Sequence, residues 1–77
     1  MTDYTKIGRN IKRYRHWKEL TQEQIAELIG VSTSFIGHVE RGTRKLSVDT
    51  LYAVCMALGV SSDKILDLEL DKEQPRG

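Results

Sequence analysis

Side chains that could carry out nucleophilic or acid–base chemistry are few in this sequence and are spread along it. The two histidines, His16 and His38, and the single cysteine, Cys55, fall on three different predicted helices. His38 and Cys55 are expected to face opposite ways, so no nucleophile lies within reach of a base. The chain also has no glycine-rich phosphate loop and no pair of ligands at metal spacing. We therefore predict that the protein is not an enzyme and that it uses no metal and no cofactor.

Recognition chemistry has a stronger signal, in the segment 21–42, TQEQIAELIGVSTSFIGHVERG. Four residues with small or polar side chains fall on one side of its second helix, opposite Ile36 and Val39: Thr33, Ser34, Gly37 and His38. Hydroxyl and imidazole groups can form hydrogen bonds with base edges, and a helix fits the major groove of DNA. The segment therefore has the layout of a DNA-reading unit. Phe35, beside the polar side, is expected to pack against a neighbouring helix.

The helices that would hold this surface are marked by capping residues. Thr21 and Gln24 fit a capping box at the start of one helix, and Gly30 fits its left-handed end. Ser32 is placed to cap the next helix, which Gly42 closes. Only about three residues separate the two helices, which is the spacing of a helix-turn-helix.

Three further helices are predicted around this pair. They are expected over residues 5–19, from a cap at Ser47 to about Leu58, and from a cap at Ser61 or Ser62 through SDKILDL. Apolar residues at helical spacing should bury one face of each longer helix: Ile7, Ile11 and Tyr14; Ile25, Ala26, Leu28 and Ile29; and Val48, Leu51, Val54, Cys55 and Leu58. Trp17 is expected to cover the edge of the core. The predicted fold class is all-α, a compact domain of five helices.

The pattern changes near the C-terminus. Leu66, Leu68 and Leu70 alternate with acidic residues, a period of two that favours a strand. The last residues, DKEQPRG, are polar and are expected to fray. We predict a single domain over residues 1–77, with a core at 5–68 and a tail at 69–77 that is frayed or associated with a dimer.

Length and composition indicate a small globular protein. A chain of 77 residues buries a modest core, and its hydrophobic content of 39% is ordinary for a globular domain. No apolar run approaches the roughly 18 residues needed to span a bilayer, and the N-terminus has no signal-peptide pattern. One cysteine cannot form an internal disulfide. These features predict a cytoplasmic protein that does not bind membranes.

Charge is distributed unevenly along the chain. Residues 1–45 hold nine Lys and Arg against five Asp and Glu, whereas residues 46–77 hold three against six. The opposite net charges of these two segments suggest that residues 1–45 bind a polyanion and that residues 46–77 do not. Chance clustering on a solvated surface is an equal alternative from charge alone.

The segments LTQEQIAELIGVS, FIGHVERG and SVDTLYAVCMALGVSSDKIL resemble the phage-repressor type of helix-turn-helix, the lambda repressor and Cro-like (XRE) family. The resemblance covers residues 7–66. It lies in the glutamine that opens the second helix, the alanine within that helix, the glycine of the turn, and the Glu-x-Gly that follows the third helix. The family often has a proline just before the cap of the fourth helix, where this chain has Leu46.

The resemblance implies five helices, with the third as the reader of double-stranded DNA. It implies three groups of contact residues: Gln22 at a phosphate; Ser32, Thr33, Ser34, Gly37 and His38 near the bases; and Arg41, Thr43, Arg44 and Lys45 at the DNA backbone. Phosphate contacts would set the position of the protein and base contacts the sequence. In this arrangement His38 could donate to guanine N7 or O6, and the absence of a side chain at Gly37 could let the helix sit deeper.

Arg15 falls beside the apolar stripe of the first predicted helix, where an unpaired buried charge would be very unfavourable. The family pairs an arginine of the first helix with the glutamate after the reading helix, which implies an ion pair between Arg15 and Glu40. The alternative is a surface pair of little energetic value.

The hydroxyl-rich reader offers few bidentate base contacts, so one copy would bind weakly and mostly through phosphates. A homodimer that reads two half-sites about 34 Å apart would solve this. The residues assigned to the dimer interface are Ile65, Leu66, Leu68 and Leu70, although Ile65 and Leu66 could instead close the monomer core.

The leading interpretation is a sequence-specific transcriptional regulator that binds a pseudo-palindromic operator as a homodimer. Phage-type repressors, restriction-modification controllers and antitoxin-like regulators all fit, and a regulatory protein partner stays open. The alternative from another class is a protein-interaction module that retains the fold and binds a protein through residues 33–38. The basic residues near the loop favour DNA.

Overall fold

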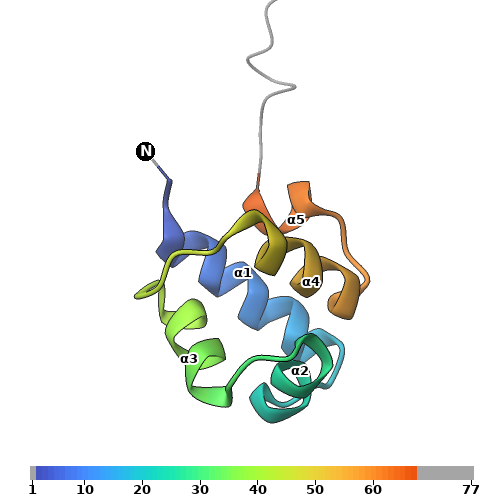
Figure 1. Cartoon of the computed structure of the whole chain (residues 1–77). Coiled ribbons are helices and arrows are strands. Elements are labelled where there is room, and N and C mark those ends of the chain that lie inside the picture. The colour runs from blue at the N-terminus through green and yellow to red at the C-terminus, as the bar shows by residue number, and fades with distance from the viewer. Residues whose placement is uncertain (1, 68–77) are drawn as a thin grey trace, which may run out of the picture.

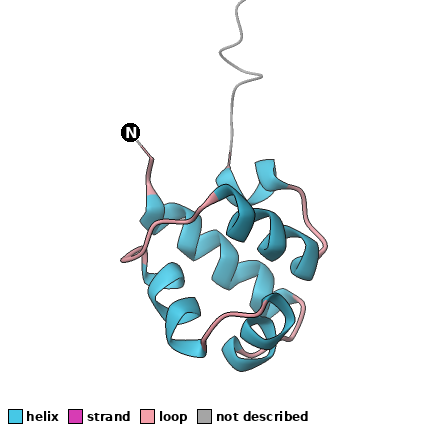
Figure 2. Ribbon diagram, in the orientation of Figure 1, coloured by secondary structure: helices cyan, strands magenta, loops and turns pink. Residues whose placement is uncertain are grey.

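The structure is a computed structural model, and it describes residues 2–67. Five helices follow one another in this part of the chain: α1 (Tyr4–Trp17), α2 (Gln22–Ile29), α3 (Thr33–Arg41), α4 (Val48–Leu58) and α5 (Ser62–Leu66). Helix α1 runs through the middle of the bundle and packs against α3, α4 and α5, while α2 packs against α3 and α4 (Figure 1). Within residues 2–67 only helices and loops are present, which confirms the all-α prediction (Figure 2). None of these helices combines the length and apolar character needed to cross a membrane.

Local sequence signals account for the ends of the middle helices. The Thr21 hydroxyl accepts a hydrogen bond from the Gln24 N–H at 3.0 Å, and the Gln24 side chain accepts one from the Thr21 N–H at 2.8 Å. Ser32 and Ser47 cap α3 and α4 with their hydroxyls. Gly30 closes α2 in the left-handed conformation, at φ 77°. The predicted boundaries of α2, α3 and α4 are therefore confirmed.

The first helix differs slightly from its prediction. It begins at Tyr4, because the Asp3 side chain caps it by accepting from the Lys6 N–H at 3.1 Å. It ends at Trp17 and not at residue 19, because the backbone at Glu19 is left-handed, with φ 57°. The last helix, α5, starts after Ser61, whose side chain makes no capping hydrogen bond.

Each of the five helices contributes to one hydrophobic core. Its most deeply buried members are six aliphatic side chains: Ile11, Ile25, Ile36, Val54, Leu58 and Ile65. Cys55 joins this core, as predicted for a small hydrophobic residue. Burial and the nearby Asp63 carboxylate raise the pKa of the Cys55 thiol, which keeps it protonated and unreactive.

Three residues predicted to be buried or to cover the core are exposed. Leu28 is 63% exposed, Val48 is 82% exposed and Trp17 is 74% exposed. An apolar residue at helical spacing is buried only where another element covers it. Ile25 and Ala26 turn α2 toward its neighbours, which leaves Leu28 on the outside, and Val48 stands at the very start of α4.

Two polar contacts fasten α5 to α1. The buried Asn10 side chain donates to the Ile65 carbonyl at 2.9 Å, and Lys6 forms an ion pair with Asp67 at 3.0 Å. Ile65 itself has no exposed surface, so its assignment to a dimer interface is wrong, and it closes the monomer core instead. Leu66 belongs to α5 and is half-buried, so no strand begins there. Leu68 and Leu70 lie outside the described residues.

Helices α1 and α3 cross at very short range. A Cβ atom added to Gly8 would lie 2.2 Å from the Val39 carbonyl oxygen and 2.6 Å from the Glu40 carbonyl oxygen. Any side chain at residue 8 would therefore overlap the backbone of α3. The glycine allows the C-terminal half of α3 to rest directly on α1, which sets the position of α3.

Candidate nucleic-acid interface

The start of α3 presents three exposed hydroxyl groups, on Ser32, Thr33 and Ser34. The Ser32 oxygen accepts the Phe35 N–H at 3.0 Å as the helix cap, and its own proton remains able to donate to a ligand. The three hydroxyls lie at a helix N-terminus, where unpaired N–H groups and the helix dipole favour negative charge. This end of α3 can therefore donate to base edges or to phosphates.

The Arg41 side chain covers Gly37 on the surface of α3. A Cβ atom at Gly37 would lie 3.2 Å from a guanidinium nitrogen of Arg41, so the arginine folds back over the glycine. Gly37 is buried beneath it, while Arg41 is exposed. The space expected to let the helix sit deeper in a groove is thus taken by the Arg41 guanidinium. This places five hydrogen-bond donors beside the hydroxyl-rich end of the helix.

His38 and Thr43 contact each other at the other end of the helix. The His38 ring nitrogen Nδ1 lies 2.9 Å from Thr43 Oγ1, and the Thr43 hydroxyl donates to the His38 carbonyl at 3.1 Å. Thr43 was assigned to the DNA backbone from the sequence, but its hydroxyl turns back onto α3. The imidazole is thereby held in one orientation on the exposed side of the helix.

The basic loop after α3 is exposed, with Arg44 and Lys45 both reaching solvent. The Arg44 guanidinium lies 5.2 Å from the centre of the Phe35 ring, within range of a cation–π interaction. Phe35 is half-buried and packs against the core, which agrees with its expected structural role. Phe35 therefore restrains Arg44 next to the first turn of α3, where the hydroxyls are.

A buried ion pair joins α1 to α3. Arg15 Nε donates to Glu40 Oε2, and a second guanidinium nitrogen donates to Glu40 Oε1 at 3.0 Å. The remaining terminal nitrogen donates to the Leu20 carbonyl at 2.8 Å. The Arg15 and Glu40 side chains are 7% and 3% exposed, so this is the buried arrangement and not the surface pair. It ties the C-terminal part of α3 to the helix that crosses behind it.

Glu40 also receives a hydrogen bond from α2. Gln22 Nε2 donates to Glu40 Oε1 at 3.0 Å, so one carboxylate is held by both α1 and α2. Burial alone would raise the pKa of Glu40, but the hydrogen bonds from Arg15 and Gln22 and the Arg15 charge outweigh it and lower the pKa. The second amide proton of Gln22 can still donate to a ligand at the N-terminus of α2.

Comparison with known proteins places these features in a family. A family model described as Helix-turn-helix, HTH_3, matches residues 11–65, which include every residue of α2, α3 and α4. The chain belongs to this helix-turn-helix family. The resemblance to phage-repressor-type DNA-binding proteins is therefore confirmed.

Relatives of this helix-turn-helix protein are controllers and repressors. It is 38% identical over 60 residues to the control protein C.SmaI of Serratia marcescens, an alignment that covers 78% of this chain and 71% of the relative. It is 39% identical over 69 residues to the immunity repressor of Bacillus phage phi105, which covers 88% of this chain and 48% of that protein. These relatives are transcriptional regulators and not enzymes, in agreement with the prediction that this chain is not an enzyme.

Solved structures that resemble this chain also belong to regulators. The restriction-modification controller protein C.AhdI of Aeromonas hydrophila superposes with a TM-score of 0.79 at 32% identity, over 84% of this chain and 98% of that one. The clp gene regulator ClgR of Corynebacterium glutamicum superposes with a TM-score of 0.81 at 31% identity, over 83% and 68% of the two chains. The helix-turn-helix arrangement of α2 and α3 is thus shared with known regulators.

Some contacts of the helix-turn-helix site were not predicted from its sequence. They are the bond from Gln22 to Glu40, the Arg41 fold over Gly37, and the return of Thr43 to His38. The last had a usable signal, because the residue after a left-handed glycine cap often sends its N–H back to the helix end. The Arg41 contact also has a local basis, because Gly37 and Arg41 lie four residues apart on α3. The bond from Gln22 to Glu40 joins two helices, depends on tertiary placement and had no such signal.

Proposed function

We propose that this helix-turn-helix protein is a transcriptional regulator that inserts α3 into the major groove of a pseudo-palindromic operator and binds it as a homodimer. One observation carries the proposal: the exposed side of α3 is polar and is flanked by cations. Ser32, Thr33, Ser34 and His38 would meet base edges or nearby phosphates. Family membership with controllers and repressors supports the regulatory role.

Phosphate contacts would supply most of the affinity. Gln22 stands at the start of α2, Arg41 is the last residue of α3, and Arg44 and Lys45 follow in the exposed loop. Each cation that neutralises a phosphate releases counterions from the DNA, so binding weakens steeply as salt rises. The Arg41 guanidinium, folded over Gly37, could also reach a base.

Replacing Lys45 with alanine should weaken binding to every duplex by a similar factor. The slope of log affinity against log salt should fall in magnitude by about one, because one phosphate contact is lost. The measurement is an electrophoretic shift or fluorescence anisotropy titration at two or more salt concentrations. Lys64→Ala is the matched control, because Lys64 is an exposed lysine on α5, away from the polar side of α3.

An unchanged salt slope in Lys45→Ala would remove the loop from the DNA contact. If the wild type binds no duplex at low salt, the protein-interaction module becomes the better interpretation. That alternative would use the same residues 33–38 to bind a protein, and its binding would not depend on nucleic acid.

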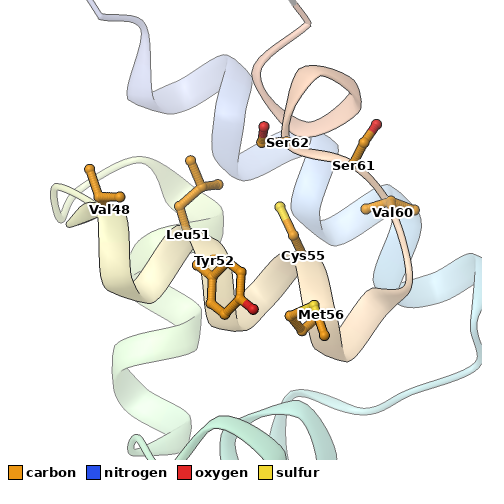
Figure 3. A pocket seen from close by; sticks show the side chains of 8 residues that line it. All are labelled: Val48, Leu51, Tyr52, Cys55, Met56, Val60, Ser61 and Ser62. Carbon is orange, nitrogen blue, oxygen red and sulfur yellow. The ribbon is translucent and has the colours of Figure 1, made fainter.

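The dimer contact that the described residues support best is on α4. Val48, Tyr52 and Met56 recur every fourth residue, so they form one stripe along the helix, and all three are largely exposed. A groove of about 360 Å³ lies beside them, lined also by Leu51, Cys55, Val60, Ser61 and Ser62 (Figure 3). The half-buried Leu66 follows on α5.

A second copy of the chain fits this surface. The stripe can pack on its own counterpart across a two-fold axis, and it contains no charge that would have to be buried. Of the residues that the sequence assigns to the dimer interface, Leu66 is part of this proposed surface. Leu68 and Leu70 lie outside the described residues, and their role in the dimer remains a prediction. Two copies would present two α3 helices to the two half-sites of the operator.

Met56→Glu should shift the protein from dimer to monomer, because it places a charge in the apolar stripe without lowering helix propensity. Sedimentation at micromolar concentration should show the loss, and operator affinity should fall with it. His16→Glu adds the same charge at an exposed position on α1 and should leave the dimer intact. A wild type that is monomeric throughout, or a Met56→Glu variant that dimerises equally well, would exclude this surface.

A further inference from the structure

Thr43 holds His38 through three contacts at the end of α3. The Thr43 N–H donates to the His38 carbonyl at 2.9 Å, the return bond expected after a helix closed by a left-handed glycine. The Thr43 hydroxyl donates to the same carbonyl at 3.1 Å, and its oxygen lies 2.9 Å from His38 Nδ1. The two bonds to the carbonyl hold the Thr43 hydroxyl in place, and the third contact occupies one of the two ring nitrogens.

Counting protons shows which form of the imidazole these contacts require. The carbonyl oxygen can only accept, so when all three contacts are hydrogen bonds the single proton of the Thr43 hydroxyl is donated to the His38 carbonyl. The contact between Oγ1 and Nδ1 is then a hydrogen bond only when Nδ1 carries a proton and donates it. A neutral imidazole with its proton on Nδ1 has a lone pair on Nε2. With all three contacts formed, Nε2 of a neutral His38 is therefore an acceptor.

The Nε2 atom is available to a ligand. His38 lies on the polar side of α3, and within residues 2–67 only Nδ1 of its ring is given a hydrogen-bond partner. In the major groove the exocyclic amines of adenine and cytosine donate, whereas guanine N7 and O6 accept. A lone pair on Nε2 can accept a hydrogen bond from the amine of adenine or cytosine, and it is repelled by the acceptor atoms of guanine.

We infer that Thr43 is a positioning residue that makes His38 an acceptor, and that His38 thereby selects adenine or cytosine at one base of each half-site. The inference rests on the proposed function. It differs from the sequence-based expectation that His38 donates to guanine. It also gives Thr43 a role in specificity, where the sequence suggested contact with the DNA backbone.

The tautomer can be measured without DNA. Long-range proton–nitrogen NMR correlations at about pH 8.5, where imidazoles are neutral, report which ring nitrogen carries the proton. Wild-type His38 should carry it on Nδ1, with the exposed His16 as internal reference. Thr43→Val, which removes the hydroxyl at similar volume, should move the population toward Nε2–H, and Thr43→Ser should retain the wild-type form. A wild-type His38 protonated on Nε2 overturns the inference, whether or not the protein binds DNA.

The base preference is measured by selection from a random duplex pool, with thermal melting to verify that each variant is folded. Wild type and Thr43→Ser should enrich adenine or cytosine at one position of each half-site, and His38→Ala should lose roughly tenfold discrimination there and nowhere else. The Thr43→Val variant should also accept guanine at that position, because Nε2 of its His38 can then carry a proton and donate it.

The outcomes of this selection distinguish the proposed DNA-binding function from the inference about Thr43 and His38. A wild type that enriches no duplex at low salt overturns the proposed function and the base preference together. Normal enrichment by the wild type, with an unchanged preference in Thr43→Val, overturns the inference and leaves the proposed function standing.

Discussion

Replacing Arg15 with alanine should lower the free energy of unfolding by about 3–5 kcal/mol, because it leaves the buried Glu40 carboxylate without its main partner. For a domain of this size each kcal/mol corresponds to about 4–8 °C in melting temperature, so the midpoint should fall by more than about 12 °C. Lys12→Ala, at an exposed position on the same helix, should have a small effect. Thermal and urea unfolding followed by circular dichroism measure both, and equal small shifts would contradict the prediction.

Two further measurements test the origin of this loss. The double variant Arg15→Met with Glu40→Leu should recover much of the stability, since it removes both buried charges and fills the space. The folded pKa of Glu40 is lowered, so the pair stabilises the fold above the unfolded pKa, and this stabilisation is lost as pH falls through the folded value. The difference between wild type and Arg15→Ala should therefore shrink in acid.

Gly8→Ala should destabilise the protein by about 3 kcal/mol or more, through overlap with backbone atoms that have little freedom to move. Helix propensity alone predicts the opposite, a gain of about 1 kcal/mol from replacing glycine inside a helix. The sign of the effect therefore distinguishes tertiary overlap from local preference. The new methyl group would lie 2.2 Å from the Val39 carbonyl oxygen, so α3 must move away from α1.

Gly30→Ala is the matched control for Gly8→Ala. Gly30 has a positive φ of 77°, but a Cβ atom there would meet nothing within 4 Å. The Gly30→Ala variant should therefore lose only about 1–2 kcal/mol of unfolding free energy, from the strain of a left-handed backbone. Urea unfolding of both variants gives the comparison. A Gly8→Ala variant as stable as the wild type would show that the two helices can separate freely.

Helix ends were predictable because they depend on a few neighbouring residues. Thr21, Ser32 and Ser47 each cap a helix with a hydroxyl, and the glycines at 30 and 42 close the helices before the next segment. These are local contacts three or four residues apart, so the sequence contains all the information needed. The same holds for the polar side of α3, which follows from helical period alone.

Burial at the edges was less predictable, because it depends on which element covers a residue. Leu28 and Val48 match the apolar pattern of their helices, yet both are exposed. Ile65 looked available to a partner, but α1 covers it and Asn10 bonds to its carbonyl. Gly8 carries no helical signal, and its role appears only when α3 lies across it. Tertiary crossings of this kind leave no local pattern.

The Glu40 carboxylate accepts hydrogen bonds from α1 and α2 while belonging to α3, and this has a mechanical consequence. The angle between α2 and α3 cannot change without stretching bonds to a buried charge. In the proposed complex the protein is therefore the stiff member, and the adjustments of docking fall on the DNA. Operators whose central steps bend or twist easily should bind more tightly, even where no side chain contacts those bases.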